Sequence, residues 1–218
     1  MLFTICMMTV LMHDSVSAAN VKLNRTQVQI VRGDTYRLYV KGTTAKVKWY
    51  SSNAKIATVS NGKVTAKKKG TAVIYAKVNG KKYACKVTVV TQQRAYIDTL
   101  QRQINIQRRR YGFNSYDRNP LLQQAAQKRA KELAEKFSHA RPNGYSWASA
   151  ISMRYNFKKA SELTARYYTD PQEVVDAWMS KASTKAKIIS KRYNEIGVGV
   201  YLDEDGFLYY AVIVAVRK

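Results

Sequence analysis

The hydrophobic period of this chain changes near Thr91, and this change limits the folds that the chain can adopt. From Val21 to Val90 apolar residues recur at every second position in short runs such as "TQVQIV", "VKWYS" and "TAVIYA", which is typical of β-strands. After the polar joint at residues 91–95, apolar residues recur at helical spacing. The sequence therefore predicts two domains, the first all-β and the second α/β.

Turn residues define the first domain, which we place at residues 20–90. Asn61-Gly62 and Asn79-Gly80 suit type I′ hairpin turns, because both central positions of such a turn need positive φ. Several short strands separated by such turns predict a small immunoglobulin-like β-sandwich. The stretch "VKWYSSNAKIATVSNGKVTAKKKGTAVIYA" resembles the central part of bacterial immunoglobulin-like group 2 domains. The resemblance implies that Trp49 is a buried core anchor and that the domain is a spacer or adhesive module without catalytic residues.

Helical patterns and a closing hairpin define the second domain. The segment "AYIDTLQRQINIQRRRYG" predicts a helix that ends near Gly112, and "LLQQAAQKRAKELAEKF" predicts another after Asn119-Pro120, with Phe137 on its apolar face. A third helix should follow Asp170-Pro171, and the chain closes with two strands around an Asp-Gly turn. Helices followed by an apolar hairpin predict a layered α/β arrangement.

Basic residues outnumber acidic ones by 38 to 14, and the excess is uneven. Residues 20–90 hold sixteen bases against the single acid Asp34, while residues 91–218 hold twenty-two against twelve. Such a field attracts an anionic cell-wall polymer or an anionic lipid surface, although scattered lysines also fit a merely solvated surface. Nucleic acid is the less favoured partner, because the tyrosines lie in strand patterns and because we expect an export signal at the N-terminus, as described next.

Residues 1–18 are interpreted as a signal peptide. The apolar run "LFTICMMTVL" is too short to span a bilayer, and Val16 and Ala18 suit the positions before a cleavage site. No lysine or arginine precedes the run, so a start further upstream or a weak anchor remains an alternative. We expect a secreted, extracellular protein without a transmembrane segment in the mature chain, and with the cell wall as one place of attachment.

Cysteine usage favours no disulfide and no cysteine-rich metal site. Cys6 lies in the signal peptide, so only Cys85 remains, at a position that predicts a buried thiol in a strand. The acids Asp203, Glu204 and Asp205 lie in the closing turn, where a solvated turn is favoured over a metal site.

Four segments in order make residues 96–218 resemble the CAP superfamily, also called the SCP-like extracellular domain. They are "AAQKRAKELAEKFSHARPNG", "ASELTA", "VVDAWMSKA" and "YNEIGVGVYLDEDGFLYYAVIVAV". In that family two histidines and two acids can line a cleft, and some members bind divalent ions there. The resemblance matches His139 to the first histidine and Glu162 to one acid, but Thr184 and Lys181 occupy the other two positions.

The residues at these positions disfavour a metal site and a hydrolytic triad. Zinc needs three or four converging ligands, and an ammonium at Lys181 would repel a dication, so we predict no cofactor and no metal. Ser138 adjoins His139 in sequence, which disfavours a productive nucleophile and base pair. We expect His139 and Glu162 to form a hydrogen-bonded pair that stabilises the cleft wall.

These observations favour a non-enzymatic binding protein, in which the sandwich carries a CAP-like domain with a degenerate ligand cleft at His139, Glu162, Lys181 and Thr184. The alternative is a degenerate CAP-type hydrolase or peptidase, in which His139 and Glu162 act as a catalytic acid and base.

Overall fold

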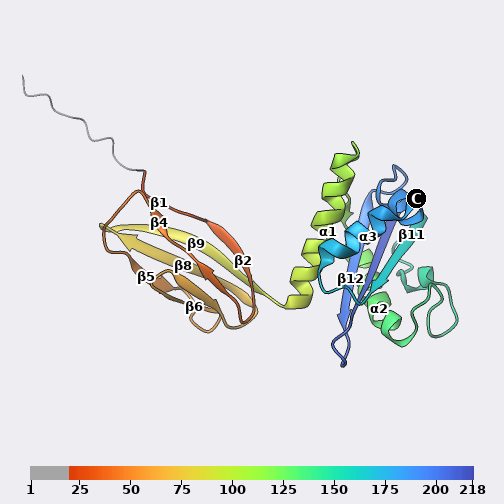
Figure 1. The fold of residues 1–218 in the computed structure, drawn as a ribbon, viewed down its shortest axis with the longest axis horizontal. Helices are drawn as coiled ribbons and strands as arrows, with labels where there is room; N and C mark the ends of the chain where they lie inside the picture. Colours follow the sequence, from red (N-terminus) through yellow and green to blue (C-terminus); the bar gives the residue numbers. More distant parts are fainter. Residues whose placement is uncertain (1–19) are drawn as a thin grey trace, which may run out of the picture. The chain divides into compact units, whose positions relative to one another are not determined.

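The computed structural model describes residues 20–218, so the predicted signal peptide and Cys6 lie outside the described residues. The described residues divide into two compact domains, residues 20–89 and Val90–Lys218. Figure 1 shows strands throughout the described part of the first domain, and helices packed against a sheet in the second. The predicted fold classes, a β-sandwich followed by a layered α/β domain, are both present.

Short antiparallel strands build the N-terminal domain. A four-stranded sheet has the order β2-β9-β8-β5, a three-stranded sheet has the order β3-β7-β6, and β1 pairs with β4. The strands are β1 (Lys22–Leu23), β2 (Gln27–Val31), β3 (Thr35–Arg37), β4 (Val40–Lys41), β5 (Lys48–Ser51), β6 (Ala57–Ser60), β7 (Lys63–Ala66), β8 (Gly70–Val78) and β9 (Lys81–Val90).

The predicted hairpin turns are confirmed. Asn61 and Gly62 have φ of 46° and 80°, and Asn79 and Gly80 have φ of 47° and 78°. These positive values are the ones that a type I′ turn requires at its two central positions. The two turns fix the register of β6 with β7 and of β8 with β9.

Two core predictions for this domain had different outcomes. Cys85 is fully buried with a free thiol, as predicted, and burial raises the pKa of this thiol. Trp49 packs against the core as predicted, but its side chain is only partly buried. The reason is its place on β5, an edge strand, from which the indole extends over Gly62.

The C-terminal domain contains helices on both faces of a four-stranded sheet, whose order is β10-β12-β13-β11. Its elements are α1 (Gln92–Arg110), β10 (Asp117–Arg118), α2 (Pro120–Glu135), the 3-10 helix η1 (Trp147–Ala150), β11 (Phe157–Arg166), α3 (Pro171–Ser180), α4 (Ala182–Ile188), β12 (Glu195–Leu202) and β13 (Leu208–Arg217). Strand β10 runs parallel to β12, and the other pairs are antiparallel.

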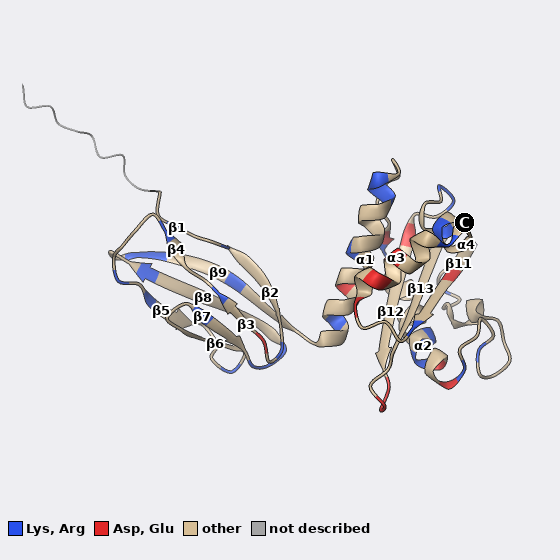
Figure 2. Ribbon diagram, viewed as in Figure 1, with Lys and Arg blue, Asp and Glu red and all other residues tan. Residues whose placement is uncertain are grey.

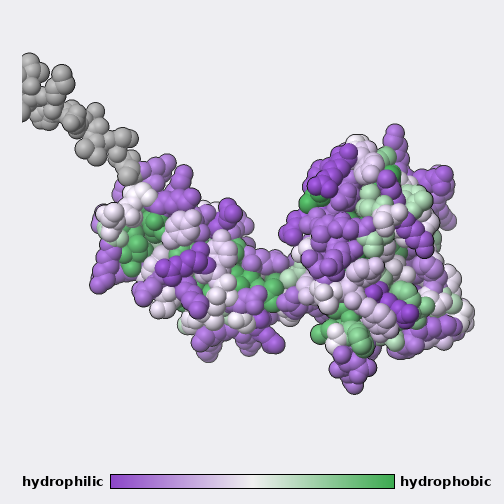
Figure 3. Space-filling view, in the orientation of Figure 1, coloured by the Kyte–Doolittle hydropathy of each residue, from purple (hydrophilic) through white to green (hydrophobic). Residues whose placement is uncertain are grey.

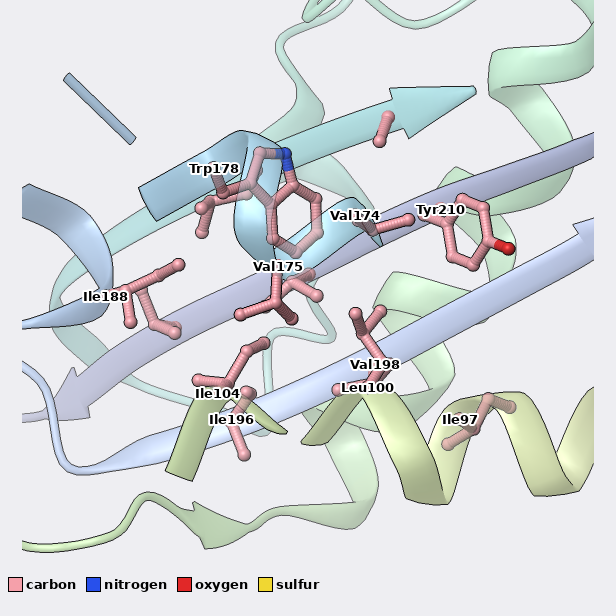
Figure 4. Packing of buried hydrophobic residues seen from close by; sticks show 14 of the residues in the cluster. Ile97, Leu100, Ile104, Val174, Val175, Trp178, Ile188, Ile196, Val198 and Tyr210 are labelled. Atoms are coloured by element: carbon pink, nitrogen blue, oxygen red, sulfur yellow. The ribbon is translucent and has the colours of Figure 1, made fainter. Parts of the chain in front are cut away.

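One face of this sheet is covered by α1, α3 and α4, and the other by α2 and η1. In Figure 4, Trp178 and Val175 of α3 and Leu100 of α1 pack over the sheet residues Val198 and Tyr210. The second face buries Leu122, Ala126 and their neighbours on α2 against Ile213 and Ala215 of β13. Because the sheet is covered twice, its central strand β13 is almost continuously buried.

Helix α2 lies directly against β12 because two glycines remove the side chains between them. A Cβ built at Gly197 would lie 2.1 Å from the carbonyl of Leu122, and one at Gly199 would lie 2.0 Å from that of Ala126. The amide of Gln127 donates to the carbonyl of Val200 at 2.9 Å, and Gln123 does the same to Val198. The α2 glutamines thus satisfy backbone groups on an edge that β10 does not reach.

The helix starts follow the predicted capping residues, but two boundaries differ from prediction. The joint predicted at residues 91–95 is shorter, since Thr91 caps the amide of Arg94 and α1 already begins at Gln92. Helix α2 ends at Glu135, and Phe137 is exposed instead of lying on the buried helical face. There the guanidinium of Arg166 lies 4.5 Å from the Phe137 ring centroid.

Candidate functional site around His139 and Glu162

Glu162 is the buried centre of the candidate site. It lies in the middle of β11, is 1% exposed, and its carboxylate faces α2. One carboxylate oxygen accepts a hydrogen bond from Nε of Arg129 at 2.7 Å, and the other lies 2.7 Å from Nδ1 of His139. The predicted pairing of His139 with Glu162 is therefore present, and both carboxylate oxygens have partners.

Arg129 is the counter-charge that allows Glu162 to be buried. Its side chain comes from α2 and is itself fully buried. Besides the bond to Glu162, it donates to a carboxylate oxygen of Glu132 at 2.8 Å and to the carbonyl of Ser138 at 2.7 Å. Burial lowers the pKa of Arg129, but the hydrogen bonds and charges of Glu162 and Glu132 outweigh it, so the pKa is raised overall.

Glu132 extends this network into the loop that carries His139. Arg141 donates to Glu132 at 2.7 Å and to the hydroxyl of Ser149 at 2.9 Å. Burial raises the pKa of Glu132, but the bonds from Arg141 and Arg129 outweigh it and hold the pKa below its ordinary value. The loop after α2 is therefore fixed to the helix by ion pairs that are largely shielded from solvent.

His139 is the part of this network that reaches solvent. Its side chain is 58% exposed, while the backbone carbonyl accepts a bond from the amide of Trp147 at 3.0 Å. A neutral imidazole that donates through Nδ1 to Glu162 has Nε2 as a hydrogen-bond acceptor. The ring is thus oriented by a buried carboxylate, and Nε2 can accept a hydrogen bond from a bound molecule.

The other two predicted cleft residues lie at the junction of α3 and α4. The hydroxyl oxygen of Thr184 lies 2.6 Å from the carbonyl oxygen of Trp178, and Lys181 is exposed. Within residues 20–218, no hydrogen bond or ion pair joins either residue to His139 or Glu162. Helix α4 nevertheless contacts the strand of Glu162, since the ammonium of Lys187 donates to the backbone carbonyl of Glu162 at 3.0 Å.

These residues do not fit the divalent ion that some relatives bind. The structure places Arg129 on one oxygen of Glu162 and His139 on the other, so a metal would have to displace one of them. No group of three or more histidine, cysteine or acidic residues in the described part of the chain is arranged to hold an ion. A fixed guanidinium beside the carboxylate also opposes the approach of a dication.

The serine beside His139 has a structural role. The hydroxyl oxygen of Ser138 accepts a bond from the amide of Ala140 at 3.1 Å, and its carbonyl accepts from Arg129.

In the closing turn, the carboxylate of Asp203 accepts a bond from the amide of Phe207 at 2.7 Å, which is the role of a turn residue.

A separate groove of about 800 Å³ is lined by residues of α2 and by Tyr201 of β12, and it contains none of the four predicted cleft residues. Its lining includes Gln124, Lys128, Lys131, Glu135 and Tyr201, together with Glu132 from the ion-pair network. Glu132 therefore connects this groove to the network behind His139.

Sequence analysis missed Arg129, Glu132, Arg141 and Lys187. Arg129 carried a signal that could have identified it, because it falls on the apolar stripe of α2 between Leu122 and Leu133, where a charge must be paired if the helix is buried. The other three are recognisable only once the loop and α4 have been placed in space.

Comparison with known proteins now adds to this geometry. Residues 101–215 match the model of the cysteine-rich secretory protein (CAP) family. The chain belongs to this family. Residues 17–89 match the bacterial Ig-like domain of group 2, so the N-terminal domain is of that kind. CAP and Ig-like domains are typical of extracellular proteins. None of the helices that the structure describes is long and apolar enough to cross a membrane.

Individual relatives of the CAP domain are distant. The uncharacterized protein YkwD of Bacillus subtilis is 28% identical over 98 residues, which are 44% of this chain and 38% of that protein. An outer surface protein of Borrelia burgdorferi has a TM-score of 0.53 at 22% identity, over 58% of this chain and 96% of that one. An SCP-domain extracellular protein of Bacillus anthracis has a TM-score of 0.51 at 18% identity, over 62% of this chain and 46% of that one. These structures show the shared fold.

Proposed function

We propose that the protein is a non-enzymatic binding protein outside the cytoplasm, in which the Ig-like domain attaches the CAP domain to an anionic cell surface and the CAP domain binds a ligand at His139. The observation that carries this proposal is the geometry of His139. Its ring is more than half exposed, yet it is held at 2.7 Å by a carboxylate that is itself buried and paired. A fixed polar group on a rigid support is well suited to recognition, because little conformational entropy is lost on binding.

Three features support binding over catalysis. Both oxygens of Glu162 are engaged, the neighbouring serine shapes the loop, and Thr184 bonds to a backbone carbonyl. A hydrolase would need a nucleophile or an activated water beside the imidazole, oriented by a third group. The polar groups around His139 instead stabilise the loop that carries it.

The experiment uses His139 as its own probe, since it is the only histidine after residue 19. The protein is labelled with ¹³C-histidine and titrated with glycan and peptide fragments from bacterial cell walls, while the imidazole resonances are recorded. Saturable shifts of the His139 signals with any of these fragments support the proposal. Unchanged signals with fragments that bind elsewhere on the protein would place the ligand site away from His139.

The geometry of the histidine also favours one second candidate, a degenerate hydrolase or peptidase. Anchoring of Nδ1 by Glu162 makes Nε2 the acceptor, which is the arrangement of a general base oriented by a carboxylate. Cleavage of wall glycans or peptides that is lost on His139→Ala and retained in Lys181→Ala would establish this function in place of the first. We expect no cleavage above background.

A further inference from the structure

The outer face of the four-stranded sheet in the Ig-like domain carries lysines directly opposite one another on neighbouring strands. Lys48 of β5 pairs with Lys77 of β8, and Lys77 pairs in turn with Lys82 of β9. Directly paired residues have their side chains on the same face, so three ammonium groups form one row across three strands. All three side chains are exposed.

This arrangement opposes the stability of the sheet. Like charges directly opposite each other repel, and a sheet is normally stabilised by opposite charges or apolar pairs at such positions. Every ion pair in the described part of the chain lies between Arg94 and Arg217, so no acid within residues 20–89 compensates the row. Figure 2 shows the same contrast, with basic positions on several strands of this domain and acidic positions mainly in the CAP domain.

A shallow hollow lies beside the row. It has a volume of about 180 Å³ and is lined by Lys46, Lys48, Lys77 and the turn residues Asn79 and Gly80. Three lysines thus line a depression that is large enough for a phosphate group, and the adjoining turn offers backbone and amide groups. In the view of Figure 3, hydrophilic side chains cover much of the visible face of this domain.

Aromatic residues form the next row on the same face. Tyr50 and Tyr75 are paired across β5 and β8, and their rings stack with centroids 5.0 Å apart. The ammonium of Lys82 lies 3.9 Å from the Tyr75 ring centroid, so one end of the basic row is held in place by the stack. The stacked tyrosines therefore position the ammonium of Lys82.

We infer that this sheet face, defined by Lys46, Lys48, Lys77 and Lys82, binds a linear phosphodiester-linked polymer that lies across the strands. Neighbouring strands are about 4.8 Å apart. A chain crossing this face therefore meets a lysine on each of β5, β8 and β9. Lipid binding would also require exposed apolar side chains that insert into the bilayer, and on this face Tyr50 is 40% exposed but has its ring stacked on Tyr75. The inference deepens the proposed function, since it names the partner that attaches the protein to the cell surface.

The test compares two triple variants of the full chain with the same net charge. Lys48→Gln/Lys77→Gln/Lys82→Gln removes the row, while Lys63→Gln/Lys67→Gln/Lys68→Gln removes three exposed lysines on and after β7 of the other sheet. Binding to poly(glycerol phosphate) is measured for each variant at several salt concentrations. Both variants should stay folded, because all six side chains are exposed.

We expect the row variant to bind at least about tenfold more weakly and the control variant to bind within about threefold of the wild type. In single-stranded nucleic acids each phosphate contact contributes about 0.7 to the dependence of log affinity on log salt, so loss of the row should reduce this slope by about 2. Equal losses in the two variants would show that net charge alone is responsible, and unchanged binding in both would exclude the row. Each of these results overturns the inference.

A second arm separates the polymer from a lipid surface. Vesicles that contain phosphatidylglycerol are offered at the same phosphate concentration. Weaker binding to vesicles than to the polymer supports the inference, whereas tighter, row-dependent binding to vesicles would replace it with membrane attachment. The shifts of the His139 resonances with cell-wall fragments are measured in the same variants. Because His139 belongs to the other domain, this measurement distinguishes a failure of the lysine row from a failure of ligand binding by the CAP domain.

Discussion

The Ig-like domain has its charged residues on the surface, whereas the CAP domain buries several of them as ion pairs. Residues 20–90 hold sixteen bases and one acid, with lysines facing lysines in the register of the sheet. In the CAP domain, Arg129 is fully buried and contacts both Glu132 and Glu162. The difference indicates that charge in the first domain is available to a partner, while charge in the second holds a loop in place.

The largest expected effect comes from breaking the buried network. Glu162→Gln removes the charge opposite Arg129 and should lower the free energy of unfolding of the CAP domain by about 3–5 kcal/mol, because it leaves a buried guanidinium without full compensation. The matched control is Asp98→Asn, which removes the charge of partly exposed pairs with Arg94 and Arg118. This control should cost about 0–1 kcal/mol.

Denaturant unfolding of the full chain measures both variants. Similar losses for Glu162→Gln and Asp98→Asn would contradict the contrast between buried and surface charge in this molecule.

The second-largest expected effect is that acid lowers the stability of the two domains to different extents. The pKa values of Glu132 and Glu195 are both lowered in the folded protein. Burial alone would raise each pKa, but hydrogen bonds outweigh it. These bonds come from Arg141 and Arg129 to Glu132, and from Tyr155 and Asn119 to Glu195. Each group therefore binds its proton more weakly when folded. The stability that it contributes is present above its unfolded pKa of about 4.3 and is lost as the pH falls towards the lower folded value.

The measurement is a pair of calorimetric melts of the full chain at about pH 7 and about pH 3. We expect a clear fall in the melting temperature of the CAP domain and a smaller one in the Ig-like domain, whose lysines keep their charge and whose only acid is Asp34. A larger fall in the Ig-like domain would reverse the comparison.

A smaller effect should appear when the lysine row is interrupted. Lys77 has a lysine opposite it on each side, so Lys77→Gln should raise the stability of the Ig-like domain by about 0.5 kcal/mol at low salt. The gain should vanish in about 1 M salt, where the Debye length is only about 3 Å. Lys55→Gln, in an exposed turn outside the strands, is the control and should change stability little. A stabilisation that persists at high salt would show that repulsion is not its cause.

Zinc should have the smallest effect. A ligand at a hundred times its dissociation constant adds about 2.7 kcal/mol of stability, which a thermal melt detects easily. Since both oxygens of Glu162 are already paired, we expect excess zinc to leave the melting temperature of the CAP domain unchanged. A rise of several degrees that disappears in His139→Ala would instead establish a metal site there.

Local patterns predicted much of the fold. The Asn-Gly turns, the capping residues Asn119 and Asp170 and the closing hairpin depend on neighbours in sequence, and all are present. Strand β11 and helix α4 were not predicted, because "FKKASELTAR" and "ASTKAKI" have mixed patterns whose structure depends on tertiary packing.

The candidate site was predictable only in part. The pair of His139 and Glu162 followed from family resemblance. Arg129 lies on the apolar stripe of α2, so the sequence indicates that its charge must be paired, but it does not indicate with which residues. Its partners lie 3 and 33 residues away, and the longer of these contacts exists only because the sheet pairs β11 with β13, the strand that α2 covers. Long-range ion pairs of this kind are not contained in any local pattern.

The most direct test of the division between the two domains is cosedimentation of the full chain with isolated cell-wall material, for the wild type, Lys48→Gln/Lys77→Gln/Lys82→Gln and His139→Ala. We predict that the triple variant loses most of its association at physiological salt, while His139→Ala sediments like the wild type. Loss of association in His139→Ala with full retention in the triple variant would contradict the account, since it would place surface attachment in the CAP domain and leave the lysine row without a partner.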